Sequence, residues 1–177
     1  GRIILLEPRR IAAVAAARWM ARTLGEEVGR TLGYSIRFDS RLSRETRIEV
    51  VTEGVLTRRL VADPTLEGVS LVIFDEFHER SLQTDLALAL CLDCQRGLRE
   101  DLRLVVMSAT LDATPVARLL GDAPVLIGEG KAFPVEERFL EPERDRSLTD
   151  RVVRAVGLAL RETAGDILVF LPGAGEI

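Results

Sequence analysis

The feature that most constrains the fold is a series of five short, unbroken apolar runs, at residues 3–6, 48–51, 71–74, 104–107 and 167–171. Aliphatic runs of this length, without alternating polar residues, are typical of strands buried on both faces of a parallel sheet. Stretches with helical periodicity separate several of the runs, and a chain of 177 residues is long enough to form a packed core. The sequence therefore predicts an α/β fold, with a parallel sheet and helices on both faces.

Turn-forming and capping residues mark the expected helix ends. Pro8 suits the first position of an Ala-rich helix, and Gly25 is placed to end it. Thr52 suits the cap of a second helix, which residues 63–64 (Asp-Pro) would end. Further helices are predicted at residues 82–92, from about residue 112, and through Val152, Val153, Val156 and Leu160.

The periodicity is interrupted between Gly121 and Pro134, where glycine, proline and single charges alternate. We therefore predict one domain at residues 1–124, a linker at 125–135 and the opening of a second domain at 136–177. Because a predicted strand starts at the first residues and another ends close to the last, the chain is expected to be an excerpt of a longer protein. No stretch approaches the roughly 20 apolar residues that cross a bilayer, so we expect a cytoplasmic protein without membrane contact.

Each of the first four apolar runs is followed directly by a polar cluster. The clusters are Glu7-Pro8-Arg9-Arg10, Thr52-Glu53-Gly54, Asp75-Glu76-Phe77-His78 and Ser108-Ala109-Thr110. In open parallel sheets, ligands bind outside the carboxyl ends of the strands, so four such clusters indicate a site there.

The adjacent carboxylates of Asp75 and Glu76 would repel each other without a nearby cation. Mg²⁺ takes one or two carboxylates together with waters and substrate phosphates, so one acid on the metal and one orienting water would suit phosphoryl hydrolysis. On these two residues alone, a solvated strand end with a nearby salt bridge is the favoured interpretation, because charged pairs are common at sheet ends.

Arg9 and Arg10 fall in the expected first turn of a helix, where the helix dipole disfavours cations. A bound phosphate would reverse that sign, and the helix after Thr52 offers a second N-terminus of this kind. The alternative is that both arginines extend into solvent. The net charge of −4 excludes a wholly basic nucleic-acid coat but permits local basic sites.

The order of these motifs resembles that of the DEAH-box ATP-dependent RNA helicases of superfamily 2. Asp75-Glu76-Phe77-His78, continued by Glu79-Arg80-Ser81, is similar to motif II, and Ser108-Ala109-Thr110 is similar to motif III. Residues 8–10 resemble motif Ia, 52–56 motif Ib and 170–173 the strand at motif IV. Phe77 replaces the alanine of the eponymous motif, which is typical of the bacterial HrpB type.

The resemblance implies a RecA-like (P-loop NTPase) first lobe that lacks its N-terminal P-loop unit, and the start of a second RecA-like lobe. It implies that ATP and Mg²⁺ bind at Asp75 and Glu76, with Asp75 holding the metal through water and Glu76 activating the attacking water. His78 would link this site to coupling residues Ser108, Ala109 and Thr110. The RNA sugar-phosphate backbone would be contacted by Pro8, Arg9, Arg10, Thr52, Glu53 and Gly54.

A P-loop needs a glycine-rich turn that ends in Lys-Ser or Lys-Thr. Residues 128–132 fail this pattern, because Ala132 follows Lys131 and has no hydroxyl. The phosphate-binding lysine and the arginine finger are thus expected elsewhere in the protein, and this chain alone is predicted to lack significant ATPase activity. Two alternatives stay open: a non-catalytic nucleic-acid clamp with the same fold, and a superfamily 2 translocase that acts on DNA.

Overall fold

The computed structural model describes residues 1–177 except 110–112, 129, 131–132, 142–146, 174 and 176–177. The chain divides into two compact units, Gly1–Ile127 and Gly128–Ile177. The strands are β1 (Arg2–Leu6), β2 (Leu32–Ile36), β3 (Asp39–Arg41), β4 (Ile48–Val51), β5 (Val69–Phe74) and β6 (Arg103–Val106). The helices are α1 (Arg10–Thr23), α2 (Glu53–Ala62), the 3-10 turn η1 (Phe77–Glu79), α3 (Leu82–Gly97), α4 (Thr114–Leu119) and α5 (Leu148–Glu162).

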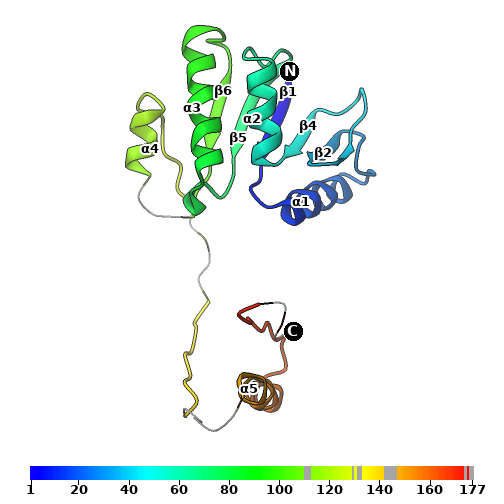
Figure 1. Ribbon diagram of the computed structural model, residues 1–177, viewed down its shortest axis with the longest axis vertical. Helices are drawn as coiled ribbons and strands as arrows, with labels where there is room; N and C mark the ends of the chain where they lie inside the picture. Colours follow the sequence, from blue (N-terminus) through cyan, green and yellow to red (C-terminus); the bar gives the residue numbers. More distant parts are fainter. Residues whose placement is uncertain (110–112, 129, 131–132, 142–146, 174, 176–177) are drawn as a thin grey trace. The chain divides into compact units, whose positions relative to one another are not determined.

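The first unit is built on one six-stranded sheet in the order β3-β2-β4-β1-β5-β6 (Figure 1). All neighbouring strands run parallel except β2 and β3, which form an antiparallel hairpin at one end. The predicted α/β class, with a mainly parallel sheet and covering helices, is confirmed. Strands were correctly predicted at β1, β4, β5 and β6, each within one or two residues of its ends.

Successive residues of the strands face opposite helices, because side chains alternate along a strand. Val50 packs with Ala13 and Ala17 of α1, whereas Val51 packs with Leu56 of α2 and Leu88 of α3. Thus α1 covers one face of the sheet, and α2 and α3 cover the other (Figure 1). This two-sided cover is the reason that the strands appear as unbroken apolar runs in the sequence.

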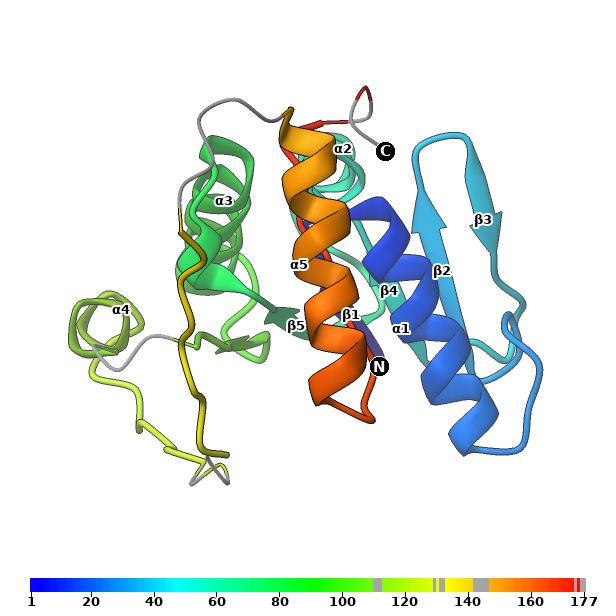
Figure 2. The same ribbon diagram turned by 90° about the horizontal axis from the view of Figure 1, so that it is seen from below.

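The hairpin of β2 and β3 was not predicted. Its first strand, Leu-Gly-Tyr-Ser-Ile, mixes apolar and small polar residues and contains Gly33, which weakens a strand prediction. The structure explains this glycine, because a Cβ at residue 33 would lie 2.2 Å from the carbonyl oxygen of Arg41. Figure 2 shows the hairpin at the end of the sheet beside α1.

Two features of α1 can be compared with the prediction. Gly25 ends the helix as expected: it has φ +69°, and the N–H of Glu26 donates to the carbonyl of Ala21. The start was misplaced, because Pro8 is not the first helical residue. The helix begins at Arg10, and the N–H of Arg9, which is extended, donates to Glu7 Oε1 at 3.3 Å.

A buried ion pair fastens β4 to α2. Glu49 is fully buried in β4, and both of its carboxylate oxygens accept hydrogen bonds from Arg59 of α2, at 2.7 and 2.9 Å. Hydrogen bonding to Glu49 raises the pKa of the Arg59 guanidinium. A buried carboxylate in this position requires a partner, because an unpaired charge in the core is costly.

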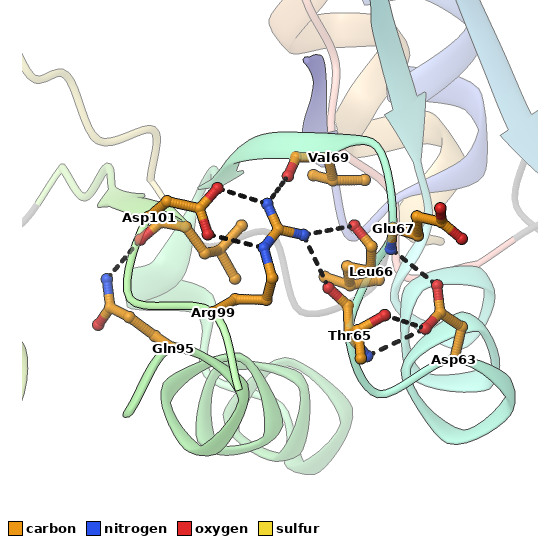
Figure 3. Close-up of polar contacts among 9 residues, drawn as sticks. Asp63, Thr65, Leu66, Glu67, Val69, Gln95, Arg99 and Asp101 are labelled. Carbon is orange, nitrogen blue, oxygen red and sulfur yellow. Dashed lines mark hydrogen bonds and ion pairs between the residues drawn. The ribbon is translucent and has the colours of Figure 1, made fainter. Parts of the chain in front are cut away.

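At the end of the sheet opposite to the polar clusters, the side chain of Arg99 joins two segments of the chain by hydrogen bonds (Figure 3). Its guanidinium forms two hydrogen bonds of 2.7 Å with the carboxylate of Asp101. The same group donates to the backbone carbonyls of Thr65, Leu66 and Val69 at 2.9 to 3.2 Å. One side chain therefore joins the turn after α3 to the loop that leads into β5.

The second unit contains α5, whose N-cap Ser147 accepts the N–H of Asp150 at 3.1 Å. The strand predicted at residues 167–171 is wrong, since these residues form no strand in the structure. A strand needs a neighbour to pair its backbone N–H and C=O groups. Among the described residues of this unit there is no other strand to supply one. No helix within the described parts of the chain is long and apolar enough to cross a membrane.

We expect the substitution Arg59→Ala to destabilise the first unit by up to about 3–5 kcal/mol, because it removes both hydrogen bonds to the buried Glu49 carboxylate and leaves the more distant Arg2, at 3.6 Å, as its cation. The free energy of unfolding from urea titrations measures this loss. The matched control is Arg58→Ala, which removes a neighbouring charge from the same helix, and we expect it to change stability by no more than about 0.5 kcal/mol. Equal effects of both substitutions would contradict the role assigned to the pair.

Candidate functional site

The polar clusters meet at one edge of the sheet, where four parallel strands end. The chain after β1 is joined to β4 by a hydrogen bond from the N–H of Glu7 to the carbonyl of Val51, at 2.9 Å. The chain after β5 is joined to β1 by the N–H of Asp75 and the carbonyl of Leu6, at 3.0 Å. Met107 joins β6 to β5 by donating to the carbonyl of Phe74 at 2.8 Å. The predicted grouping is therefore observed for the described residues.

Asp75 and Glu76 form a tight turn directly after β5. The Oδ1 atom of Asp75 accepts the backbone N–H of Glu76 at 2.8 Å, and Glu76 has φ +50°. A left-handed backbone at a non-glycine residue is uncommon and is often found at functional sites. The turn directs the chain away from the sheet, and the Glu76 side chain remains 45% exposed.

His78 connects this turn to the segment after β6. The N–H of Ala109 donates to Nδ1 of His78 at 3.2 Å, and the same nitrogen lies 3.4 Å from Oε2 of Glu76. A nitrogen that accepts the N–H of Ala109 cannot at the same time donate a hydrogen bond to Glu76. We therefore assign the hydrogen bond, rather than an ion pair with Glu76, as the contact of this nitrogen. Thr110, also predicted as a coupling residue, lies outside the described residues.

Phe77 turns inward from the same segment. It is only 6% exposed and packs edge-on against Phe74, with ring centroids 6.5 Å apart. The guanidinium of Arg80 lies 5.5 Å from the Phe77 ring centroid. The aromatic residue that replaces alanine in the motif therefore fills the core beneath the acidic turn, which keeps that turn close to the sheet.

Glu7 is a buried acid of the first polar cluster, to which the sequence assigned no role. It is 7% exposed, and burial raises the pKa of its carboxyl group. The nearby carboxylates of Asp75, Glu76 and Glu79 raise this pKa further, while the hydrogen bond from the N–H of Arg9 opposes the shift. The edge of the sheet is therefore strongly acidic, which suits a cation or a cation-bound phosphate. In the sequence, the signal for Glu7 was its position directly after the apolar run at residues 3–6.

The two arginines of the first cluster point to different partners. Arg9 pairs with Glu79, donating from Nε to Oε2 at 3.3 Å and from Nη2 to Oε1. Arg10 donates to the backbone carbonyl of Arg37, at 3.2 Å, in the turn of the β2–β3 hairpin. The sequence placed both arginines together and identified neither partner, because each partner is distant along the chain.

The residues of the cluster after β4 also have different roles. Thr52 is the N-cap of α2 through its backbone, but its hydroxyl does not cap the helix. The Oε1 atom of Glu53 instead accepts hydrogen bonds from the hydroxyls of Ser81 and Thr84, at the start of α3. Glu53 therefore ties the N-termini of α2 and α3 together.

One group of described residues has the spacing of a metal site. Ligand atoms of Glu76, His78 and Glu79 lie within 4.8 Å of one another. This set mixes imidazole with carboxylates, whereas Mg²⁺ prefers oxygen ligands alone. The carboxylates of Asp75 and Glu76 are therefore the better match for magnesium.

The mainly parallel sheet, with helices on both faces and its polar motifs at one edge, defines the first unit as a RecA-like α/β fold. No family model matches the chain. The chain is 55% identical over its whole length to the ATP-dependent RNA helicase HrpB of Escherichia coli (strain K12), and covers 22% of that protein. It is 39% identical over its whole length to the probable ATP-dependent RNA helicase DHR2 of Saccharomyces cerevisiae, and covers 24% of it.

Solved structures agree with these sequence matches. A crystal structure of the E. coli DEAH/RHA helicase HrpB superposes with a TM-score of 0.92 at 55% identity, over 99% of this chain and 22% of that one. A crystal structure of the E. coli DExH-box NTPase HrpB gives a TM-score of 0.78 over the same shares. The resemblance to the HrpB type of DEAH helicase is confirmed. The chain spans about a fifth to a quarter of the length of these relatives.

We expect Phe77→Ala, which restores the usual residue of the motif, to destabilise the first unit by about 3–5 kcal/mol through the cavity it leaves. Urea unfolding of the variant measures the loss. Phe38→Ala is the matched control, because Phe38 is 89% exposed. If the two substitutions cost the same, Phe77 does not support the acidic turn by packing.

Proposed function

We propose that this chain contributes the magnesium-nucleotide edge and part of the nucleic-acid track of an ATP-dependent RNA helicase. The main support is the hydrogen bond from Ala109 to His78, which joins the acidic turn to the segment resembling motif III. HrpB, DHR2 and the probable helicase DHX40 of Rattus norvegicus are ATP-dependent or probable ATP-dependent RNA helicases by name.

Asp75 and Glu76 would act on Mg-ATP at the carboxyl end of β5. Their oxygen ligands and the acidic surroundings fit Mg²⁺, which when bound neutralises charge on the phosphate oxygens. Asp75 would hold the ion through water. The carboxylate of Glu76 would orient the attacking water and take its proton, and its exposure leaves room for both.

RNA would be held by its sugar-phosphate backbone along residues 8–10 and 52–54. Arg10 and the amide groups at the start of α2 supply donors suited to phosphate, and phosphate contacts carry no base specificity. Because Glu53 is bonded to Ser81 and Thr84, we assign it a positioning role between the two helices. Thr52 and Gly54 are the members of this cluster that remain for RNA.

We further propose that residues 1–124 form most of one RecA-like lobe, that 125–135 link it to a second, and that 136–177 open that second lobe. The division of the chain at Ile127 and Gly128 supports a boundary within the linker. A cytoplasmic location remains a prediction.

We expect Glu76→Gln in the full-length protein to lower RNA-stimulated ATP hydrolysis by about 10²- to 10⁴-fold, because the general base is lost while ATP binding is retained. Steady-state phosphate release and nucleotide binding measure the two effects. Glu100→Gln, at the other edge of the sheet, is the matched control and should hydrolyse ATP normally. Near-normal turnover by Glu76→Gln would refute the assignment of the base, and an inactive wild-type protein that binds RNA would favour the clamp.

Arg10→Ala should weaken RNA binding equally for all sequences and reduce the salt dependence of the binding constant by about one unit of slope. Fluorescence anisotropy with two unrelated single-stranded RNAs, over a range of salt, measures both quantities. Arg22→Ala, in the last turn of α1, is the control for the loss of one positive charge. An unchanged slope for Arg10→Ala would remove this residue from the track, and tighter binding to DNA than to RNA would favour the DNA translocase.

A further inference from the structure

The contact between Arg9 and Glu79 brings together the segments that resemble motif Ia and motif II. The two residues are 70 positions apart, and Nε of Arg9 donates to Oε2 of Glu79 at 3.3 Å while Nη2 donates to Oε1. The Arg9 side chain is 69% exposed and that of Glu79 is 30% exposed. The guanidinium is therefore accessible to a solute even while it is paired.

Glu79 occupies the position that a phosphate would take on Arg9. A guanidinium offers a planar fork of donors that fits a carboxylate or a phosphate in the same two-point geometry. Ion pairs between exposed side chains contribute only about 0.2–1 kcal/mol, so a phosphate can replace this carboxylate at little cost. The pair thus orients the Arg9 side chain, while its carboxylate partner can be exchanged for a phosphate.

The charges around the Arg9–Glu79 pair affect the approach of an anion to Arg9. Ligand atoms of Glu76 and Glu79 lie within 4.8 Å of each other, and the charges of Asp75, Glu76 and Glu79 all act on Glu7. A phosphate that approaches Arg9 is repelled most directly by Glu79, and this part of the repulsion falls when Glu79 withdraws. Removal of the Glu79 charge should therefore favour the approach of an anion.

Glu79 is also linked to the acidic turn through the backbone. It ends η1, and its N–H donates to the carbonyl of Glu76 at 2.9 Å. Its neighbour His78 carries the contact to Ala109. A displacement of Glu79 therefore acts on the backbone that positions Glu76 and His78.

We propose that Glu79 is a positioning residue that occupies Arg9 in the RNA-free protein, and that an RNA backbone phosphate displaces it from Arg9. This exchange would report RNA occupancy to the turn that carries Glu76 and His78. The inference rests on the proposed function, and it assigns Arg9 a role distinct from that of Arg10.

The test is the isosteric variant Glu79→Gln in the full-length protein. We expect it to bind a single-stranded RNA about two- to fivefold more tightly, because Arg9 no longer has a competing carboxylate. The ATPase rate without RNA should rise, and the stimulation by RNA should fall. Anisotropy titrations with one unstructured oligonucleotide and phosphate-release assays with and without it measure these changes.

Asp85→Asn is the matched control, because Asp85 forms the neighbouring exposed pair with Arg80, at 2.7 Å. It removes the same charge without touching Arg9, so it should leave RNA affinity and RNA stimulation unchanged. Arg9→Gln should weaken RNA binding, and the double variant Arg9→Gln, Glu79→Gln should bind like Arg9→Gln alone.

Weaker or unchanged RNA binding by Glu79→Gln would overturn the proposal, as would an equal gain from Asp85→Asn. A parallel loss in Arg9→Gln and Glu79→Gln would show a structural pair that phosphate does not exchange. Failure of the wild-type protein to bind RNA would instead refute the proposed function, so the two failures are distinguishable.

Discussion

The arrangement of the site depends on the position of β1 between β4 and β5. Ile4 and Leu6 of this strand are fully buried, and both neighbouring strands run parallel to it in fixed register. A shift by one residue would turn Ile4 and Leu6 from the face covered by α2 and α3 to the face covered by α1, where Leu5 now packs, so packing on both faces specifies the register. Because it is fixed, the residues after Leu6, Val51 and Phe74 leave the sheet side by side.

At the opposite end of the sheet, Arg99 supports the loop that leads into β5. Arg99 connects the loop before β5 to the turn after α3, and it does so mainly through backbone carbonyls (Figure 3). This loop includes Leu66, which is buried and has φ +46°. An apolar residue in a left-handed conformation requires support from its surroundings, and the guanidinium of Arg99 supplies it by binding the Leu66 carbonyl. The contacts of Arg99 therefore fix the start of β5, the strand whose other end leads into Asp75 and Glu76.

The sequence predicted what depends on local pattern and on strand direction. Four buried strands could be located because helices cover both faces, and their polar ends could be grouped because parallel strands end at one edge. The strand at β2 was missed because its hairpin has one open edge and needs Gly33 for a close backbone contact. The run at residues 167–171 was wrongly assigned as a strand, since an apolar run becomes a strand only where another strand can pair with it.

Side-chain partners were the part of the site that the sequence could not supply. Arg9 and Arg10 are adjacent and chemically identical, so no local pattern separates them. Their partners, Glu79 and the carbonyl of Arg37, are set by how β1 and α1 lie relative to η1 and the hairpin. Arg9 is extended and precedes the helix, whereas Arg10 is its first residue, so the two side chains leave different backbone conformations. The start of α1 therefore contacts η1 through Arg9 and the β2–β3 hairpin through Arg10.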